Sequence, residues 1–213
     1  MTDGYARFGK RALDISAALA LIITLAPVFL VISLAIVLDD FGSPLFSQTR
    51  IGRDKRPFRI LKFRSMRTKA PAEAATARAY SERDPRITRV GRIIRATSLD
   101  ELPQIFNILA GSMSLIGPRP IVPAQLTAIR PDQEGRFRVR PGITGLAQVS
   151  GRRDLAWPDQ LALDSSYADK VSFLSDLQIF LRTFAVVFRA SDVYGDPGKN
   201  WRNFIIHEDQ NPS

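Results

Sequence analysis

Two adjacent carboxylates, Asp100 and Glu101, stand just downstream of a series of regularly spaced arginines. The arginines are Arg86, Arg89, Arg92 and Arg95. Acids surrounded by that much positive charge suggest a site that handles phosphate, because an ionised aspartate can act as a nucleophile or as a ligand of a metal cation. The alternative is that the two acids only cap a helix, which is the commoner role of a Ser-x-x-Glu segment.

A helix must present these carboxylates, and the residues that follow them have the spacing of one. The apolar residues of a single face recur at i, i+3, i+4 and i+7, as Leu102, Ile105, Phe106 and Leu109. The Ser98-x-x-Glu101 pattern predicts a capping box at the start of this helix, and Gly111 predicts its C-cap. Unpaired N–H groups at a helix start favour anions, so we expect both carboxylates to stay ionised there.

Composition restricts the chemistry to carboxylates. The chain of 213 residues has no cysteine, which excludes disulfides and thiolate metal sites. Its single histidine, His207, lies in the polar tail, which argues against a zinc site or a histidine-based triad. The net charge of +9 is concentrated in residues 50–95, which hold 15 of the 30 basic residues. Such a field attracts nucleic acid, an anionic membrane surface or a phosphorylated substrate.

An uncharged apolar segment from Ala17 to Leu38 indicates a membrane anchor. A straight helix of this length spans roughly 30 Å, and it is too long for a cleaved signal peptide. Pro27 near its middle predicts a bend, and basic residues on both sides place both ends in the cytoplasm. A re-entrant helix broken at Pro27 satisfies these observations, with Thr24 or nearby hydroxyls bonding the carbonyls freed at the bend. A kinked spanning helix is the alternative.

The remaining segments predict a small α/β domain. Residues 44–51 and 58–64 flank a turn and predict a β-hairpin. The prolines around Arg119 predict a rigid loop that presents this guanidinium to a phosphate. Residues 173–188 predict either a buried core helix or an interfacial helix on the bilayer. We therefore expect an anchor over 1–40, a mostly helical catalytic domain over 41–192 and a peripheral tail over 193–213.

Several dense motifs, taken in order, resemble those of the bacterial sugar transferases, the monotopic phosphoglycosyl transferases. The resemblance runs from about residue 10 to about residue 189. It is carried by Lys10-Arg11-x-x-Asp14, the arginines of 86–95, Asp100-Glu101, Gly117-Pro118-Arg119-Pro120 and Gly151-Arg152. The family often has Ser-Pro at the membrane break, whereas this sequence has Ala26-Pro27. The resemblance implies a bacterial inner-membrane protein with its catalytic domain on the cytoplasmic face.

The resemblance also implies a reaction. Sugar 1-phosphate would pass from a UDP-sugar to a polyprenyl phosphate such as undecaprenyl phosphate, with release of UMP, as the first membrane step of a surface glycan pathway. Asp100 would attack and form a phosphosugar-aspartyl intermediate, and Glu101, together with Asp100, would bind Mg²⁺. Positions that match the family's phosphate and donor contacts are Arg95, Gly117, Pro118, Arg119 and Arg152. The anchor motif comprises Lys10, Arg11, Asp14 and Pro27, whose charged residues can pair internally and bind lipid headgroups.

The implied partners are the donor, the acceptor and membrane lipids, without nucleic acid, and a homo-oligomer is left open. Two other classes of protein are weighed against this one. A catalytically silent scaffold for glycan assembly would not need the intact Asp100, Glu101, Arg95 and Arg119. A membrane protein that binds nucleic acid would fit the basic charge, but the sequence lacks a zinc finger, RNP-like aromatics or a strong helix-turn-helix pattern. The transferred sugar is not identified, because the motifs concern phosphate, metal and acceptor.

Overall fold

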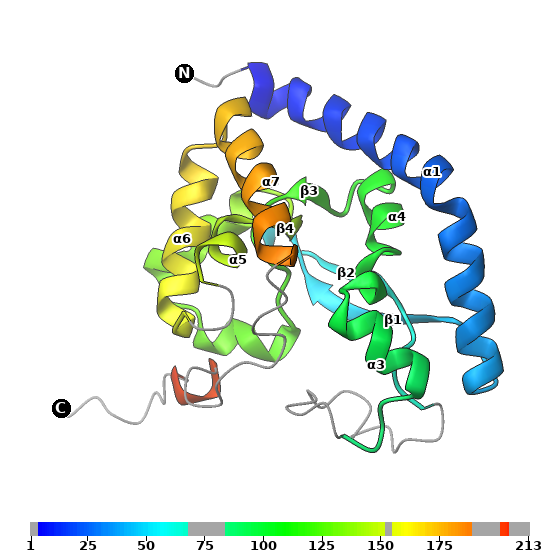
Figure 1. Ribbon diagram of the computed structural model, residues 1–213. Coiled ribbons are helices and arrows are strands. Elements are labelled where there is room, and N and C mark those ends of the chain that lie inside the picture. Colours follow the sequence, from blue (N-terminus) through cyan, green and yellow to red (C-terminus); the bar gives the residue numbers. More distant parts are fainter. Residues whose placement is uncertain (1–3, 68–83, 152–154, 189–200, 205–213) are drawn as a thin grey trace.

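The computed structural model describes residues 4–67, 84–151, 155–188 and 201–204. Over these residues the chain is mostly helical, with two sheets of two strands each. The long N-terminal helix α1 (Lys10–Asp39) curves along one side of the other elements (Figure 1). The predicted fold class, a mostly helical α/β domain with a β-hairpin and an N-terminal apolar helix, is confirmed.

Helix α1 stays helical through Pro27 and bends instead of dividing into two helices (Figure 1). A short π-helical turn, η1 (Tyr5–Gly9), precedes it, and its 30 residues are long and apolar enough to cross a membrane. Pro27 has no N–H to offer the carbonyl of Ile23. The hydroxyl of Thr24 donates to the carbonyl of Ala20, at 2.9 Å, as helical threonines often do. The prediction that Thr24 bonds the freed carbonyl is therefore wrong.

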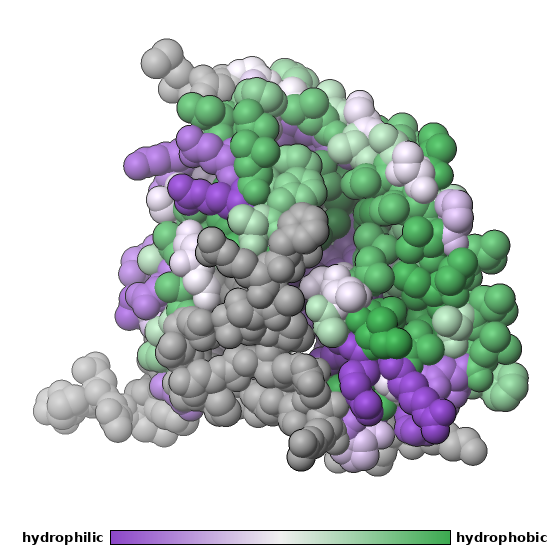
Figure 2. Space-filling view, in the orientation of Figure 1, coloured by the Kyte–Doolittle hydropathy of each residue, from purple (hydrophilic) through white to green (hydrophobic). Residues whose placement is uncertain are grey.

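One face of α1 packs on the domain, and the other is exposed and apolar. Ala18 packs with Ile105 and Ile108, and Ile36 packs with Phe63. The large apolar side chains of the other face are 48–74% exposed, namely Leu13, Leu19, Ile23, Leu30, Val31, Leu34 and Leu38. Figure 2 shows a mostly hydrophobic surface over α1 on this side of the molecule. Apolar surface of this extent marks an interaction site rather than a face suited to water.

The predicted hairpin is confirmed. Strands β1 (Leu45–Ile51) and β2 (Pro57–Phe63) pair antiparallel over their full length. The turn between them, η2 (Arg53–Lys55), places Asp54 and Lys55 at φ values of 55° and 58°. This hairpin matters for the site because β2 carries Lys62.

The side chain of Asn107 joins the hairpin to helix α4 (Gln104–Leu109). It accepts a hydrogen bond from Leu61 N at 2.9 Å and donates one to Arg59 O at 2.8 Å. One amide thus pairs with β2 as a neighbouring strand would, and it satisfies backbone groups that would otherwise be unpaired. The position of Lys62 relative to α4 is set by this pairing.

The carboxylate pair lies between two short helices. Helix α3 (Arg89–Ala96) begins at Thr88, whose hydroxyl accepts a hydrogen bond from Gly91 N at 2.9 Å. This is the usual way in which threonine starts a helix. A 3₁₀ turn, η3 (Leu99–Glu101), follows α3 and precedes α4.

The predicted capping box at Ser98 does not form. Ser98 has a left-handed conformation with φ of 58°, and its side chain caps no backbone N–H. Helix α4 begins only at Gln104, after Pro103, so the carboxylates precede the helix instead of occupying its first turn. Two cations described below hold the Glu101 side chain away from the backbone. The end of α4 is as predicted, because Gly111 follows it with φ of 82°.

A parallel pair of short strands holds the proline-containing loop. Strands β3 (Ser114–Ile116) and β4 (Gly142–Thr144) form this pair. Directly after β3, Gly117 N donates to the last carbonyl of β4, and Pro118 O accepts from the first N–H of β4, both at 2.9 Å. A Cβ on Gly117 would lie 2.3 Å from a backbone oxygen, so only glycine fits there.

The final helices of the described chain leave one apolar face open. The helical segments between β3 and residue 188 are η4 (Pro123–Ala128), η5 (Pro131–Arg138), α5 (Leu146–Ser150), α6 (Trp157–Asp169) and α7 (Phe173–Phe188). Asp176 and Ile179 of α7 are buried, whereas six of its large apolar side chains are 39–63% exposed, namely Phe173, Leu174, Leu177, Phe180, Leu181 and Phe184. The interpretation of α7 as a buried core helix is therefore wrong.

Part of the predicted tail packs on the domain. The turn η7 (Trp201–Phe204) places Trp201 and Phe204 against a cluster that includes Phe137, Trp157 and Leu161. The other residues of 193–213 lie outside the described part of the chain.

Candidate active site

Asp100 and Glu101 occupy consecutive positions on the turn η3, and both carboxylates are largely buried. The Asp100 side chain is 15% exposed and the Glu101 side chain 18%. Because their turn connects α3 to α4, their position depends on both helices. The structure thus keeps the two carboxylates adjacent, shielded from water and still reachable from outside.

Two cations from distant segments meet at one oxygen of Glu101. Lys62 Nζ lies 2.7 Å from Glu101 Oε1, and Arg119 Nη2 lies 2.8 Å from the same atom. Lys62 Nζ is also 3.9 Å from Asp100 Oδ2. Strand β2, turn η3 and the loop after β3 therefore combine two carboxylates and two cations in one cluster, the Asp100–Glu101 cluster.

The two carboxylates have opposite pKa shifts. Burial alone would raise the pKa of Glu101, but the charges and hydrogen bonds of Arg119 and Lys62 outweigh it and hold this pKa far below its usual range. Burial raises the pKa of Asp100, Lys62 opposes this rise, and the negative charge of Glu101 adds to it, so the pKa stays above its usual range. The two carboxylates precede α4, so their pKa values are set by burial and by the neighbouring charges and not by the start of that helix.

The positive charges of Arg95 and Arg119 both act on this cluster. Arg95 ends α3, and its positive charge acts to lower the pKa of Asp100. Gly117 and Pro118 provide the backbone that β4 holds, and Arg119 extends from it to Glu101. Arg152, the remaining predicted donor contact, lies outside the described residues.

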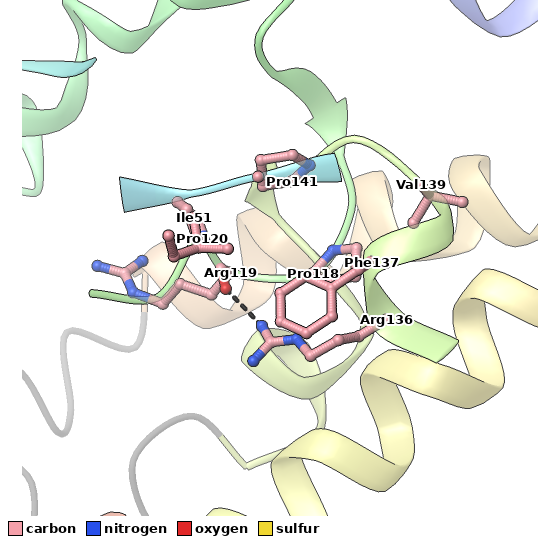
Figure 3. A pocket seen from close by; sticks show the side chains of 9 residues that line it. Ile51, Pro118, Arg119, Pro120, Arg136, Phe137, Val139 and Pro141 are labelled. Atoms are coloured by element: carbon pink, nitrogen blue, oxygen red, sulfur yellow. Dashed lines mark hydrogen bonds between the residues drawn. The ribbon is translucent and has the colours of Figure 1, made fainter. Parts of the chain in front are cut away.

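A small hollow lies behind the loop that carries Arg119 (Figure 3). Its lining consists of Ile51, Gly52, Pro118, Arg119, Pro120, Arg136, Phe137, Val139 and Pro141. Arg136 Nη2 donates to the backbone carbonyl of Arg119 at 2.6 Å and lies 2.9 Å from Asp164 Oδ2. The Arg119 side chain extends away from Phe137 in this view, so the guanidinium of Arg119 lies outside the hollow.

Sequence reasoning missed Lys62 and Arg136. Lys62 stands in an otherwise apolar part of a predicted strand, and a charge at such a position is the one signal that could have singled it out. Its partner is 39 residues away. Arg136 lies in a segment with several other charges, and its burial becomes visible only in the fold.

The charged residues at the start of α1 bind the domain. Lys10 Nζ pairs with Asp176 Oδ2 of α7 at 2.7 Å. The guanidinium of Arg11 donates to the carbonyls of Ile108 at 2.6 Å and Leu109 at 3.0 Å, the last carbonyls of α4. A cation at this end also matches the helix dipole. The prediction that Lys10, Arg11 and Asp14 pair with one another is therefore wrong, because these charges bind other elements of the domain.

Asp14 makes the third of these connections. It is 3% exposed, and its Oδ1 accepts from Leu115 N at 3.0 Å and from Ser114 Oγ at 3.1 Å. Its carboxylate therefore satisfies donors of β3, the strand that leads to Arg119. Pro27 lies farther along α1 and contributes no charge to the site.

The carboxylates of Asp100 and Glu101 fit a magnesium ion. Mg²⁺ is commonly held by one or two carboxylates together with waters and substrate phosphates. Both cations contact Oε1 of Glu101, so Oε2 can serve as a ligand. Within the described residues no group of three or more His, Cys, Asp or Glu side chains forms a dedicated metal cage. The ligand set suits a cation that is completed by substrate.

Known proteins resemble this chain over most of its length. The sequence model of the bacterial sugar transferase family matches residues 5–190. A UDP-galactose-lipid carrier transferase of Erwinia amylovora is 42% identical over 201 residues, 88% of this chain and 42% of that protein. An undecaprenyl-phosphate glucose phosphotransferase of Komagataeibacter xylinus is 44% identical over 185 residues, 82% of this chain and 35% of that protein.

A third relative is closer in length to this chain than the first two relatives are. The UDP-glucose:undecaprenyl-phosphate glucose-1-phosphate transferase of Caulobacter vibrioides is 43% identical over 195 residues, which are 87% of this chain and 72% of that protein. The chain therefore spans less than half of the first two relatives and most of the third.

Proposed function

The chain belongs to the bacterial sugar transferase family, and we propose that it transfers sugar 1-phosphate from a UDP-sugar to a polyprenyl phosphate, with release of UMP. The observation that carries this proposal is the Asp100–Glu101 cluster, in which Lys62 and Arg119 flank two buried carboxylates. Preorganised positive charge beside a carboxylate nucleophile suits phosphoryl transfer. The names of the relatives describe UDP-sugar donors and lipid-carrier or undecaprenyl-phosphate acceptors, which supports the same substrate classes here.

In the first step, a carboxylate oxygen of Asp100 attacks the phosphorus that bears the sugar. A bond forms between this oxygen and phosphorus, and the bond from phosphorus to the bridging oxygen breaks. The bridging oxygen keeps the electron pair and leaves as part of UMP, and the sugar phosphate remains on Asp100 as a mixed anhydride. The burial that raises the pKa of Asp100 also limits its hydration, which favours its use as a nucleophile.

In the second step, an oxygen of the polyprenyl phosphate attacks the same phosphorus. The bond between phosphorus and Asp100 breaks, the electron pair returns to the carboxylate, and a polyprenyl diphosphate sugar is released. The enzyme ends in its starting state. This two-step order lets a soluble donor and a membrane-bound acceptor use one site in turn.

Arg119, Lys62 and Arg95 stabilise the charge that moves during both steps. Arg119 can bind two phosphate oxygens through its planar guanidinium, whereas Lys62 acts as a point charge between the two carboxylates. Glu101 and Asp100 would hold Mg²⁺, which when bound neutralises charge on the diphosphate. Glu101 has the low pKa that suits a permanently ionised ligand.

We propose that the reaction takes place at the cytoplasmic face of the bacterial inner membrane. The exposed apolar face of α1 and the basic residues at both of its ends support this placement. Pro27 inside the curved helix α1 supports a re-entrant path for α1, and the exposed apolar face of α7 supports an interfacial position for that helix. The relatives' names include both galactose and glucose, so the transferred sugar is left open.

The proposal is tested with protein held in nanodiscs and given Mg²⁺, undecaprenyl phosphate and a panel of UDP-sugars. UMP release with at least one sugar, and a lipid-linked sugar diphosphate as second product, are expected. The matched control is Asp100→Asn, which should stay folded and membrane-bound but form no UMP. Near-full activity of Asp100→Asn would contradict the nucleophile, and silence of folded wild-type protein with every donor would favour the scaffold alternative.

A further inference from the structure

The carboxylate of Asp176, in the first turn of α7, is buried where three other segments of the chain meet. Tyr5 OH donates to Oδ2 at 2.6 Å, and Tyr167 OH donates to Oδ1 at 2.7 Å. Lys10 Nζ pairs with Oδ2 at 2.7 Å, and the side chains of Asp176 and Lys10 are only 6% and 13% exposed. One carboxylate therefore connects α7 to η1, α1 and α6. We call these four residues the Asp176 junction.

The hydrogen bonds of the junction are strong and fixed in direction. Burial raises the pKa of Tyr5, and the hydrogen bond and charge of Asp176 raise it further. Burial and Asp176 raise the pKa of Tyr167 in the same way. Both phenols are therefore neutral donors at physiological pH, and the ammonium of Lys10 balances the charge of the carboxylate. Hydrogen bonds to an ionised acceptor are stronger than those between neutral groups.

The Asp176 junction joins the two helices that carry exposed apolar faces. The ring of Tyr5, just before α1, packs edge-on against Phe173 at the start of α7, with 5.7 Å between ring centroids. Figure 2 shows hydrophobic surface over α1 and over the start of α7. The starts of these two helices are thus joined through Asp176.

The Asp100–Glu101 cluster is held by other contacts. The loop that carries Arg119 is fixed by hydrogen bonds to β4 and by Arg136. Tyr167 OH lies 3.2 Å from Ile116 O of β3, but Ser114 Oγ also lies within hydrogen-bond distance of that carbonyl, at 3.0 Å. Removing the carboxylate of Asp176 would therefore leave the geometry at Asp100 and Glu101 in place.

We propose that Asp176 is a positioning residue for the membrane-borne acceptor, an inference that rests on the proposed transferase function. By fixing the start of α7 against the start of α1, it holds both apolar faces at one level in the bilayer. A polyprenyl phosphate anchored in that bilayer then presents its phosphate to Asp100. The soluble UDP-sugar reaches the site from water and needs no such alignment.

The test measures the two half-reactions separately in nanodiscs. The first half-reaction is measured as exchange of labelled UMP into the UDP-sugar in the absence of acceptor. The second is measured as transfer of the sugar phosphate to lipid after polyprenyl phosphate is added. Asp176→Asn should keep exchange within about twofold of wild type while transfer to lipid falls by about tenfold or more, because the contacts that hold Asp100 and Glu101 are kept and the alignment of the acceptor is lost. The matched control, Asp159→Asn, changes an exposed carboxylate of α6 and should alter neither rate.

A second variant separates positioning from stability. Asp176→Asn leaves the Lys10 ammonium buried without its counter-charge, which destabilises the fold. In Lys10→Met/Asp176→Asn this charge is removed, so the melting temperature should recover while transfer to lipid stays slow. If the single variant does not fold, the same comparison of exchange and transfer is made on the double variant.

The outcomes separate this inference from the proposed function. With active wild-type protein, an equal fall of exchange and transfer in the variants, or no fall in either, overturns the positioning role of Asp176. Wild-type protein that forms neither UMP nor lipid product overturns the transferase proposal instead. Wild-type protein that forms lipid product without exchange overturns the aspartyl intermediate. The role of Asp176 is then tested by KM values: Asp176→Asn should raise the KM for polyprenyl phosphate and leave the KM for the UDP-sugar unchanged.

Discussion

Arg136 donates a hydrogen bond of 2.6 Å to the backbone carbonyl of Arg119 from a position that is 4% exposed. The same nitrogen of Arg136 lies 2.9 Å from Asp164, which is equally buried. A buried ion pair is expensive in desolvation and seldom retained for stability alone. Here Arg136 holds the backbone of Arg119 from inside the protein, and the guanidinium of Arg119 reaches Glu101.

Arg136→Met should lower both stability and turnover. Asp164 would lose its buried partner, at a cost of about 3–5 kcal/mol, and the carbonyl of Arg119 would lose its donor. The double variant Arg136→Met/Asp164→Leu should regain most of the stability, because no buried charge is left, but not the turnover. Thermal unfolding and UMP release measure the two effects. Full recovery of turnover in the double variant would show that Arg136 does not position Arg119.

Stability should decrease as the pH rises from about 4 to about 6. Burial raises the pKa of Asp164 from 3.8 to about 6, against the opposing charge of Arg136. The folded state then binds this proton more tightly than the unfolded state does, so the stabilisation is complete below the unfolded pKa and is lost as the pH passes the folded value. Melting temperatures across this range should show a larger decrease in wild type than in Asp164→Asn, because the raised pKa of Asp100 acts in the same direction in both proteins. Identical profiles for the two proteins would contradict the assignment.

Lys62→Met should reduce UMP release by about a hundredfold, the usual effect of removing one preorganised charge from a phosphoryl-transfer site. Lys62→Arg keeps the charge with a different shape and should retain more activity. Lys55→Met, at the exposed turn of the same hairpin, is the matched control and should be close to wild type. Initial rates at saturating donor measure the effect. A Lys62→Met rate equal to that of the control would remove Lys62 from the site.

Glu101→Gln should weaken the dependence of the rate on Mg²⁺ and slow the reaction strongly. The neutral amide is a poorer ligand for a hard cation than the carboxylate that Lys62 and Arg119 keep ionised. Chelation of divalent cations should stop UMP release by the wild type. A titration with Mg²⁺ gives the half-saturating concentration for both proteins. An unchanged value in the variant would exclude Glu101 as a ligand.

Features that depend on neighbouring residues were predictable from the sequence. The hairpin around residues 52–55, the end of α4 at Gly111 and the apolar anchor around Pro27 all have local signals of turn chemistry, helix termination and hydrophobic length. The adjacent pair Asp100 and Glu101 was recognisable for the same reason. The capping box at Ser98 was wrong because a short-range rule competed with the attraction of Glu101 to Lys62 and Arg119, and the long-range charges prevailed.

The sequence by itself determined which chemical groups are available: two carboxylates, a set of cations, a proline-containing loop and an apolar anchor, with no thiol. Only the tertiary structure decided which of them meet. Lys62 contacts Glu101 across 39 positions, and Asp176 contacts Lys10 across 166. Such pairings are set by the packing of distant elements, which leaves no local pattern in the chain. Burial is likewise a property of the fold. Burial raises the pKa of Asp100, whereas the charges of Arg119 and Lys62 lower the pKa of Glu101.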